Sequence, residues 1–286
     1  MLFIVGAVIV VVCTFGGYAA MGGYLGILWQ PFEVVIICGA AFGGYVIANP
    51  PVVLKKTMGA VKKASNGQRF AKKDYVELLS LLYMTFKLAK TKGMLALEQH
   101  IENPEESSLF QQFPGVANNE QALTFLRDYL RLMSLGTEDP HTLEDLMDEE
   151  IETHHKEQHR MAHAMQAVAD TLPALGIVAA VLGVIKTMAY ITEPPEVLGS
   201  LIGGALVGTF LGVWLSYGFA GPVARAMGEQ YDEETRYFQC MKAGLLAHLH
   251  GYAPAVSVEF ARKALFHQDR PDFYELEEAT NALPPG

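Results

Sequence analysis

The sequence predicts an all-α integral membrane protein with four transmembrane helices in two hairpins and a helical cytoplasmic domain. Of its 286 residues, 51% are hydrophobic, and the charged residues gather outside four long apolar stretches. Glu33 is the only charged residue among the first 54. A helix of about twenty apolar residues spans the roughly 30 Å hydrocarbon layer of a bilayer. Each apolar stretch is therefore long enough to cross a membrane.

Residues 1–54 predict the first transmembrane hairpin. Residues 1–20 are apolar and lack the basic start that is typical of a cleaved signal peptide, so we expect them to be retained as a span. A glycine-rich, uncharged turn over 21–31 leads into the second apolar stretch, 32–54. Because the connection is short, the two spans should be antiparallel.

Residues 171–223 predict the second hairpin, around which the chain is organised. The stretch 172–191 carries one charge, Lys186, and the stretch 197–222 carries none. Small residues at helical spacing clear one face of each span, and the glycines concerned are Gly176, Gly183, Gly204, Gly208 and Gly212. A cleared face lets another backbone approach closely. We therefore expect a tightly packed hairpin that faces other helices; the alternative is that glycine is simply common in membrane spans.

The distribution of basic residues predicts the orientation. Seven of them precede the first acid of the middle region, Asp74; they are Lys55, Lys56, Lys62, Lys63, Arg69, Lys72 and Lys73. The turns at 21–31 and 192–196 contain none. Cytoplasmic flanks of membrane proteins are rich in Lys and Arg. Both termini, the region 55–170 and the region 224–286 should therefore be cytoplasmic.

The region 55–170 reads as amphipathic helices. Asp74 and Glu77 have the spacing of a capping box and predict a helix start at Asp74. Asp139 and Pro140 provide an N-cap and a first-turn proline for a long helix that runs toward residue 170. The region 224–286 is expected to continue the fourth span as a helix with a short tail.

Composition and motifs argue against an enzyme. The net charge of −10 and the lack of a basic face disfavour nucleic acid, and the sequence has no GxGxxG, P-loop, GxSxG or CxxC pattern. We therefore expect no catalytic residue and no cofactor. His155, His159 and His163 recur every four residues, but nine acids share 138–157, so a solvated charged face is favoured over a metal site. We predict no metal, and metal binding by these histidines stays open.

Ion-driven membrane proteins need a carboxylate or similar group inside the membrane. In this sequence Glu33 and Asp170 fall at the ends of spans, and Lys186 can extend outward along its span. If the protein moves ions, we expect a partner chain to supply the ion-binding carboxylate.

Several patches are similar to one family. They include FGGY (15–18), QPFEVVII (30–37), GMLALEQHIENP (93–104), LMDEEIETH (146–154), DTLPALGIVAAVLGVI (170–185), GALVGTFLGVWLSYGF (204–219), LHGYAP and VEFARK. From about residue 1 to 278 the chain resembles the MotA family of flagellar motor stator subunits, within the MotA/TolQ/ExbB proton channel family. The resemblance implies a pentamer in the bacterial inner membrane around a MotB-like partner that brings the ion-binding aspartate. It also implies that ion flow drives torque on the rotor protein FliG.

The resemblance assigns roles to individual residues. Pro173 and Pro222 match prolines that couple ion events to cytoplasmic shape, and Ala180, Thr209 and Tyr217 would face the ion path. Glu98, and Lys90 where the family usually has Arg, match a charged pair that engages FliG, with Glu150 as a weaker match. Sodium-type relatives have threonines where this chain has Ala180 and Gly208, so the transported ion is expected to be H⁺.

Two other classes remain open at this stage. One is an energiser ring similar to ExbB and TolQ, although those proteins have three spans. The other is a non-conducting membrane scaffold with an acidic docking domain. Whichever class is correct, the sequence does not show how the basic run over 55–73 is arranged; contact with anionic membrane lipid, which attracts each basic residue by about 1 kcal/mol, is one expectation.

Overall fold

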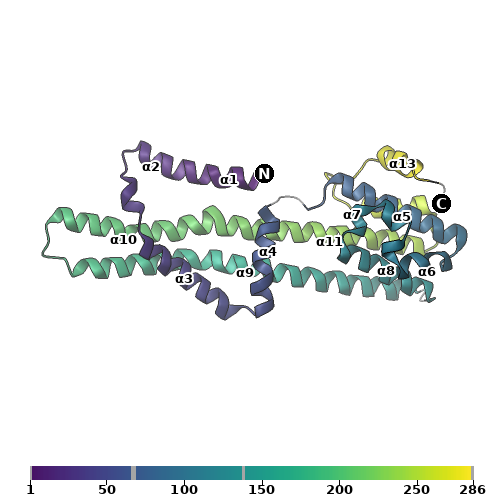
Figure 1. The fold of residues 1–286 in the computed structure, drawn as a ribbon, viewed down its shortest axis with the longest axis horizontal. Coiled ribbons are helices and arrows are strands. Elements are labelled where there is room, and N and C mark those ends of the chain that lie inside the picture. The colour runs from purple at the N-terminus through teal and green to yellow at the C-terminus, as the bar shows by residue number, and fades with distance from the viewer. Residues whose placement is uncertain (1, 66–68, 137–138, 285–286) are drawn as a thin grey trace. The chain divides into compact units, whose positions relative to one another are not determined.

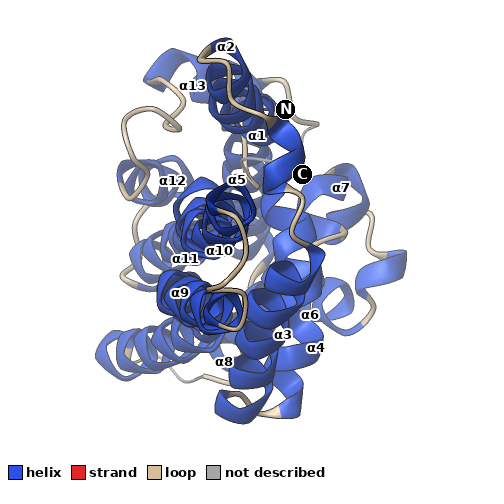
Figure 2. Cartoon of the chain, turned by 90° about the vertical axis from the view of Figure 1, so that its left-hand side faces the viewer, coloured by secondary structure: helices blue, strands red, loops and turns tan. Residues whose placement is uncertain are grey.

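The computed structural model describes residues 2–65, 69–136 and 139–284, and in those ranges all regular elements are helices (Figures 1 and 2). Four helical segments are long and apolar enough to cross a membrane: Leu2–Ala20, Leu25–Ala48, and parts of Pro140–Met188 and Pro195–Leu249. The prediction of an all-α protein with four spans is therefore confirmed.

Contacts divide the chain into two compact units. The first consists of Met1–Gly67 and Glu157–Gln230, and the second of Gln68–Lys156 and Tyr231–Gly286. Both predicted hairpins belong to the first unit, while the predicted boundaries at 54, 170 and 223 stay a prediction. The helices of the first unit are α1 (Leu2–Val11), η1 (Val12–Gly16), α2 (Gly17–Ala20), η2 (Leu25–Leu28), α3 (Pro31–Ala48), α4 (Pro51–Ser65), α10 (Pro195–Leu215) and η5 (Ser216–Ala220). Two long helices, α9 (Pro140–Met188) and α11 (Gly221–Leu249), contribute residues to both units.

The first hairpin is fastened to α10 by one hydrogen bond and a group of aromatic rings. Trp214 Nε1 donates to Thr14 Oγ1 at 3.1 Å. The Phe15 ring lies edge-on to Trp214, with centroids 5.0 Å apart, and also contacts Phe210. Thr14 and Phe15 belong to η1, a π-helical turn of the first span. A hydroxyl in an apolar span needs a hydrogen-bond partner, and here it gains one from the indole.

The two long helices of the second hairpin, α9 and α10, run side by side (Figure 1), and their backbones approach closely. A Cβ atom added to Gly176 would lie 2.7 Å from the Gly208 carbonyl oxygen, and one added to Gly212 would lie 2.5 Å from the Leu172 carbonyl oxygen. At Gly183 the same atom would lie 2.7 Å from the Ala205 Cβ. The small-residue stripes of the two spans therefore face each other within one chain.

Helix α4 follows the second span after the break at Pro50 and Pro51, and in Figure 1 it runs across the direction of α9 and α10. One face is buried and consists of Val53, Thr57, Ala60 and Ala64. Leu54, Met58 and Val61 form a second, apolar face, on which Met58 is 78% exposed. The third face is basic and consists of Lys55, Lys56, Lys62 and Lys63. A helix of this kind suits the surface of a membrane, with acyl chains on one side and headgroups on the other.

The second unit has its own hydrophobic core. Its elements are α5 (Lys72–Lys92), α6 (Leu95–Glu102), η3 (Pro104–Glu106), η4 (Phe110–Gln112), α7 (Pro114–Ala117), α8 (Glu120–Ser134), α12 (Pro254–Lys263) and α13 (Phe273–Asn281), with the ends of α9 and α11. Leu78, Leu82 and Phe86 of α5 and Leu245 of α11 are completely buried in this core. These residues lie at helical spacing, so periodicity explains which face of each helix is inside.

Two helix starts in this unit test the sequence predictions. Asp139 accepts a hydrogen bond from the Thr142 N–H at 3.2 Å and α9 begins at Pro140, as predicted. The predicted start of α5 at Asp74 is wrong, because the helix begins at Lys72. Asp74 lies in the first turn and accepts from the Ala71 N–H at 2.7 Å, while Glu77 accepts from the Gly115 N–H at 2.6 Å. The capping group therefore belongs to Asp74, and Glu77 holds a neighbouring loop.

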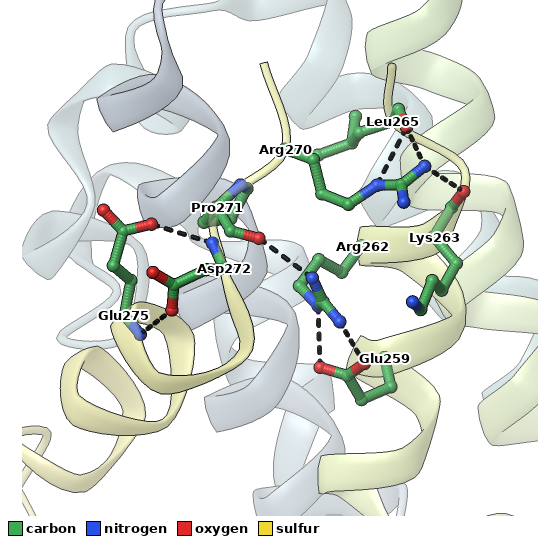
Figure 3. Close-up of polar contacts among 8 residues, drawn as sticks. All are labelled: Glu259, Arg262, Lys263, Leu265, Arg270, Pro271, Asp272 and Glu275. Carbon is green, nitrogen blue, oxygen red and sulfur yellow. Dashed lines mark hydrogen bonds and ion pairs between the residues drawn. The ribbon is translucent and has the colours of Figure 1, made fainter. Parts of the chain in front are cut away.

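Side-chain hydrogen bonds hold the segment between α12 and α13 (Figure 3). Arg262 is 6% exposed; its guanidinium donates twice to Glu259, at 2.8 Å each, and once to the Pro271 carbonyl at 2.9 Å. Arg270 donates to the carbonyls of Leu265 and Lys263. Asp272 and Glu275 form a reciprocal capping box that starts α13. Hydrogen bonds from two arginine side chains to backbone carbonyls thus hold this loop in place.

Candidate functional site

The candidate site centres on Pro173, which lies inside α9. A proline has no N–H, so Pro173 cannot donate to the carbonyl of Ala169 four residues earlier. Ala169 is 1% exposed, and a buried carbonyl without a partner costs about 1–3 kcal/mol. Ser216 supplies the missing donor, because its Oγ lies 2.6 Å from the Ala169 oxygen and is itself buried. The neighbouring helix thus satisfies the carbonyl that Pro173 leaves open.

Ser216 stands at the start of the second proline feature. It opens η5, the π-helical turn Ser216–Ala220, which is followed directly by α11 with Pro222 in its first turn. Because Pro222 also lacks an N–H, one helical hydrogen bond is missing here, and a π-helical turn is a common way to accommodate such a defect. The two prolines are therefore linked: the turn before Pro222 holds the hydroxyl that the carbonyl opposite Pro173 requires.

Glu33 is a residue whose position the sequence did not reveal. It lies in the first turn of α3, near the end of its span as expected, but its side chain is only 8% exposed. A Cβ atom added to Gly208 would lie 2.8 Å from Glu33 Oε2, and one added to Gly183 would lie 3.6 Å from Oε1. The carboxyl group therefore sits in a notch made by glycines of α9 and α10. Gln30 occupies the next notch, where a Cβ on Gly204 would lie 2.8 Å from Nε2.

The residues predicted to face the ion path differ in exposure. Ala180 is 8% exposed and lies against Gly208, where an added Cβ would be 3.1 Å from the Ala180 nitrogen. Thr209 is half-buried, and Tyr217, next to Ser216 in the π-helical turn, is 73% exposed. The role of these three residues in an ion path stays a prediction.

The residues predicted to engage a rotor all lie in the second unit and are exposed. Lys90 is in the last turn of α5 and Glu98 is in the first turn of α6, on either side of Gly93. Gly93 has φ +84°, a conformation that favours glycine, so it sets the turn that brings the two helices together. The structure thus presents a positive and a negative side chain from two consecutive helices.

Glu150 lies elsewhere on the second unit, on α9. Its Oε2 accepts a hydrogen bond of 2.6 Å from the Tyr129 hydroxyl. Burial, and then this hydrogen bond and the Glu150 charge, raise the pKa of Tyr129 above its usual range. Glu150 also lines a pocket of about 260 Å³ with Glu120, Phe125, His154 and Phe238. A partly apolar pocket with two carboxylates suits a basic side chain of another protein.

The three histidines at fourfold spacing divide between the two units. His155 Nδ1 lies 2.9 Å from Thr235 Oγ1 in the second unit, and the rings of His159 and His163 are 5.9 Å apart in the first. That no metal is bound here stays a prediction.

Fold and site together define a class: a helical membrane protein with four spans, whose third and fourth helices each contain a proline. A hydroxyl of the fourth helix donates a hydrogen bond to the carbonyl that the proline of the third leaves open. Two family models match the chain. The motility protein A N-terminal model matches residues 4–93, and the MotA/TolQ/ExbB proton channel family model matches residues 117–240.

Known proteins resemble the chain over nearly its whole length. It is 44% identical over 283 residues to motility protein A of Salmonella typhimurium, which covers 99% of this chain and 96% of that protein. It is 37% identical to chemotaxis protein LafT of Vibrio parahaemolyticus, with 96% of each chain covered. Among solved structures, the flagellar MotAB stator complex from Bacillus subtilis matches with a TM-score of 0.75 and 25% identity, over 94% of this chain and 98% of that one.

A second solved structure, C. jejuni MotAB, matches in fold with a TM-score of 0.78 at 18% identity, over 95% of this chain and 98% of that one. The chain belongs to the motility protein A family, within the MotA/TolQ/ExbB proton channel family. The family resemblance predicted from the sequence is therefore confirmed, and so is the prediction that the protein is not an enzyme.

Proposed function

We propose that this chain is a stator subunit of a bacterial flagellar motor, which conducts protons with a MotB-like partner and converts the proton-motive force into torque on FliG. The link between Pro173, the Ala169 carbonyl, Ser216 and the turn before Pro222 carries this proposal. It joins the cytoplasmic ends of two adjacent spans at the two places where their helical hydrogen bonding is interrupted. A rearrangement of the turn before Pro222 would therefore move Ser216 and change the hydrogen bond to the Ala169 carbonyl beside Pro173.

The energies involved are well matched. One proton that crosses a membrane potential of about 150 mV releases about 3.5 kcal/mol. A single buried hydrogen bond whose loss leaves a carbonyl unsatisfied is worth about 1–3 kcal/mol. One proton thus provides enough free energy to exchange the Ser216–Ala169 hydrogen bond for another arrangement. It does not provide enough to unfold a span, so small repeated steps are the expected output.

Assembly with other chains accounts for the exposed apolar surface of the spans. Ile177, Val181 and Ile185 of α9 and Leu206 of α10 are between 51% and 61% exposed. In a membrane such surfaces meet lipid or other spans. We propose a homopentamer in the inner membrane around the MotB-like partner, which would bring the ion-binding aspartate. The basic residues of α4 support a cytoplasmic location for both termini and for the second unit, which is part of this proposal.

The proposed rotor contacts use the exposed charges of the second unit. Lys90 and Glu98 would pair with opposite charges on FliG, and Glu150 would accept a basic side chain beside its pocket. Lysine at position 90 carries a point charge without the planar fork of arginine. Its contact should therefore depend on electrostatic attraction, and should weaken as salt increases.

The packing at Gly208 supports a proton as the transported ion. A threonine at this position would bring its Cβ to 2.8 Å from Glu33 Oε2 and 3.0 Å from the Ala179 Cβ. The hydroxyl that a dehydrated sodium ion would need therefore cannot be added here without moving Glu33. Swimming that persists when sodium is replaced by potassium is the expected result, and arrest in that medium would contradict a proton-driven motor.

Complementation tests the proposed function. The chain, expressed with its MotB-like partner in a strain that lacks both stator genes, should restore swimming. Pro173→Ala should assemble in the membrane but swim poorly, because its N–H would compete with Ser216 for the Ala169 carbonyl. Ser200→Ala, on an exposed position of α10, is the matched control and should swim normally. Normal swimming by Pro173→Ala would contradict a coupling role for the proline.

A further inference from the structure

We propose that Glu33 is a proton-binding site within the membrane, which this chain supplies itself, in addition to any carboxylate of a partner. In the structure its side chain is 92% buried, and Oε2 is fully enclosed without a hydrogen-bond partner among the described residues. The motor function proposed above gives Glu33 no role in binding the ion. The inference therefore stands on the surroundings of Glu33 alone.

The carboxyl group is enclosed on two sides by backbone. Gly183 of α9 and Gly208 of α10 each lack the side chain that would otherwise fill its place. Ile37 and Ala41 of the same helix belong to one buried apolar cluster with Ala179 and Val207 of the hairpin. The two glycines thus leave room for a polar group in a region that is otherwise filled with hydrocarbon.

No charged group in the packed elements compensates a negative charge. Glu33 is the only charged residue of α3, Glu196 is the only one of α10, and the membrane portion of α9 carries Asp170 and Lys186. All three of these neighbours are exposed, and the described residues form no ion pair with Glu33. The amide of Gln30 donates to the Ile27 carbonyl at 3.3 Å instead.

The protonation state of Glu33 follows from comparing the cost of burying its charge with the stabilisation that the helix dipole provides. Burial of an unpaired carboxylate costs several kcal/mol, whereas the N-terminal dipole of α3 returns at most about 2 kcal/mol. The neutral acid is therefore the stable form, which means that a proton is bound to this oxygen pair at neutral pH. Release breaks the carboxylic O–H bond, leaves its electron pair on the carboxylate and passes the proton to water. The carboxylate that remains has no charged partner among the described residues, and its Oε2 has no hydrogen-bond donor among them.

Glu33 lies at the level of Ala180, because both contact Gly208. A proton that enters or leaves this notch therefore changes the packing of α3 against both spans of the second hairpin. The protonation state of Glu33 thus affects the packing of the helices that contain Pro173 and Pro222.

Infrared spectroscopy of the full chain with its partner in lipid nanodiscs tests this proposal. Wild type and the matched control Glu196→Gln should show the carbonyl stretching band of a protonated carboxylic acid at neutral pH, and Glu33→Gln should lack that component. The component should shift on transfer to D₂O and disappear at high pH. Spectra that are the same for wild type and Glu33→Gln, or a band that never shifts in D₂O, would overturn the proposal.

Two additions keep the test decisive. If Glu33→Gln does not fold, Glu33→Asp retains an acid, and its band should differ in frequency from the wild-type band; an unchanged spectrum would count against the assignment. The infrared result is independent of swimming. A Glu33 band in a complex that does not restore motility would contradict the proposed function and leave this site in place.

Discussion

Ser216→Ala is the perturbation that probes the linked prolines most closely. The substitution removes the Oγ that donates to the Ala169 carbonyl at 2.6 Å and changes little else, because the residue remains small and helical. Both Ser216 and Ala169 are almost fully buried, so water cannot replace the donor without a rearrangement. The cost of the orphaned carbonyl is about 1–3 kcal/mol.

A second substitution turns this loss into a specific test. Pro173→Ala restores the N–H that donates to Ala169 in an uninterrupted helix, so Ser216 becomes redundant in that background. The double-mutant cycle should therefore give a coupling energy of about 1–3 kcal/mol between residues on different spans. Ser200→Ala, at an exposed position of the same helix, should change stability by less than about 0.5 kcal/mol.

The assay is thermal unfolding of the full chain in lipid micelles, followed by tryptophan fluorescence; of the two tryptophans, Trp214 lies two residues from Ser216. At about 2 °C per kcal/mol for a chain of this size, Ser216→Ala should lower Tm by about 2–6 °C. In the Pro173→Ala background the same change should lower Tm by less than about 1 °C. Equal decreases in both backgrounds would refute the link between the two prolines.

Three further predictions follow from packing, burial and charge. Gly212→Ala should destabilise the second hairpin by about 1–3 kcal/mol in the same unfolding assay, because its Cβ would lie 2.5 Å from a backbone oxygen. Gly39→Ala is the control and should be neutral, because its Cβ would meet nothing within 4 Å. Burial lowers the pKa of His100, so the unfolded chain binds more protons than the folded chain. The contribution of His100 to the free energy of unfolding should therefore be complete above pH 6.5 and decrease as the pH falls through that value. Urea unfolding of wild type and His100→Gln across this range measures the effect, and an equal dependence of stability on pH in the two proteins would contradict it. Glutamine at all four lysines of α4 should weaken the preference of the membrane-embedded complex for anionic over zwitterionic lipid by about 1 kcal/mol per charge; the lysines are Lys55, Lys56, Lys62 and Lys63. Lipid exchange in mixed nanodiscs measures this preference, and a preference equal to that of wild type would contradict the prediction.

The spans and their small-residue faces could be predicted from the sequence because both depend on local patterns. Length and apolar composition identify four crossings, and glycine at fourfold spacing identifies the faces that pack, as at Gly208 and Gly212. The residues that pack against such a face could not be predicted in the same way. Gly208 meets α9 and also Glu33 of a distant helix, and no pattern within either helix specifies that three-way contact.

The contacts that define the candidate site depend on the register between helices. Pro173 predicts a carbonyl without a helical hydrogen bond at Ala169. The donor, Ser216, is 47 residues further along the chain and can be identified only from the structure. Glu33 illustrates the same limit, because its place near a helix end suggests solvent while its side chain turns into the hairpin. The start of α5 was placed two residues late because Asp74 serves as a cap from within the first turn.

We propose that this chain works as one subunit of a proton-driven ring around a MotB-like partner. The mass of the detergent-solubilised particle, measured with and without the co-expressed partner, is the first test of this assembly. We expect a particle with the mass of five copies of this chain together with partner chains. Monomers or dimers whose mass is unchanged by the partner would contradict it.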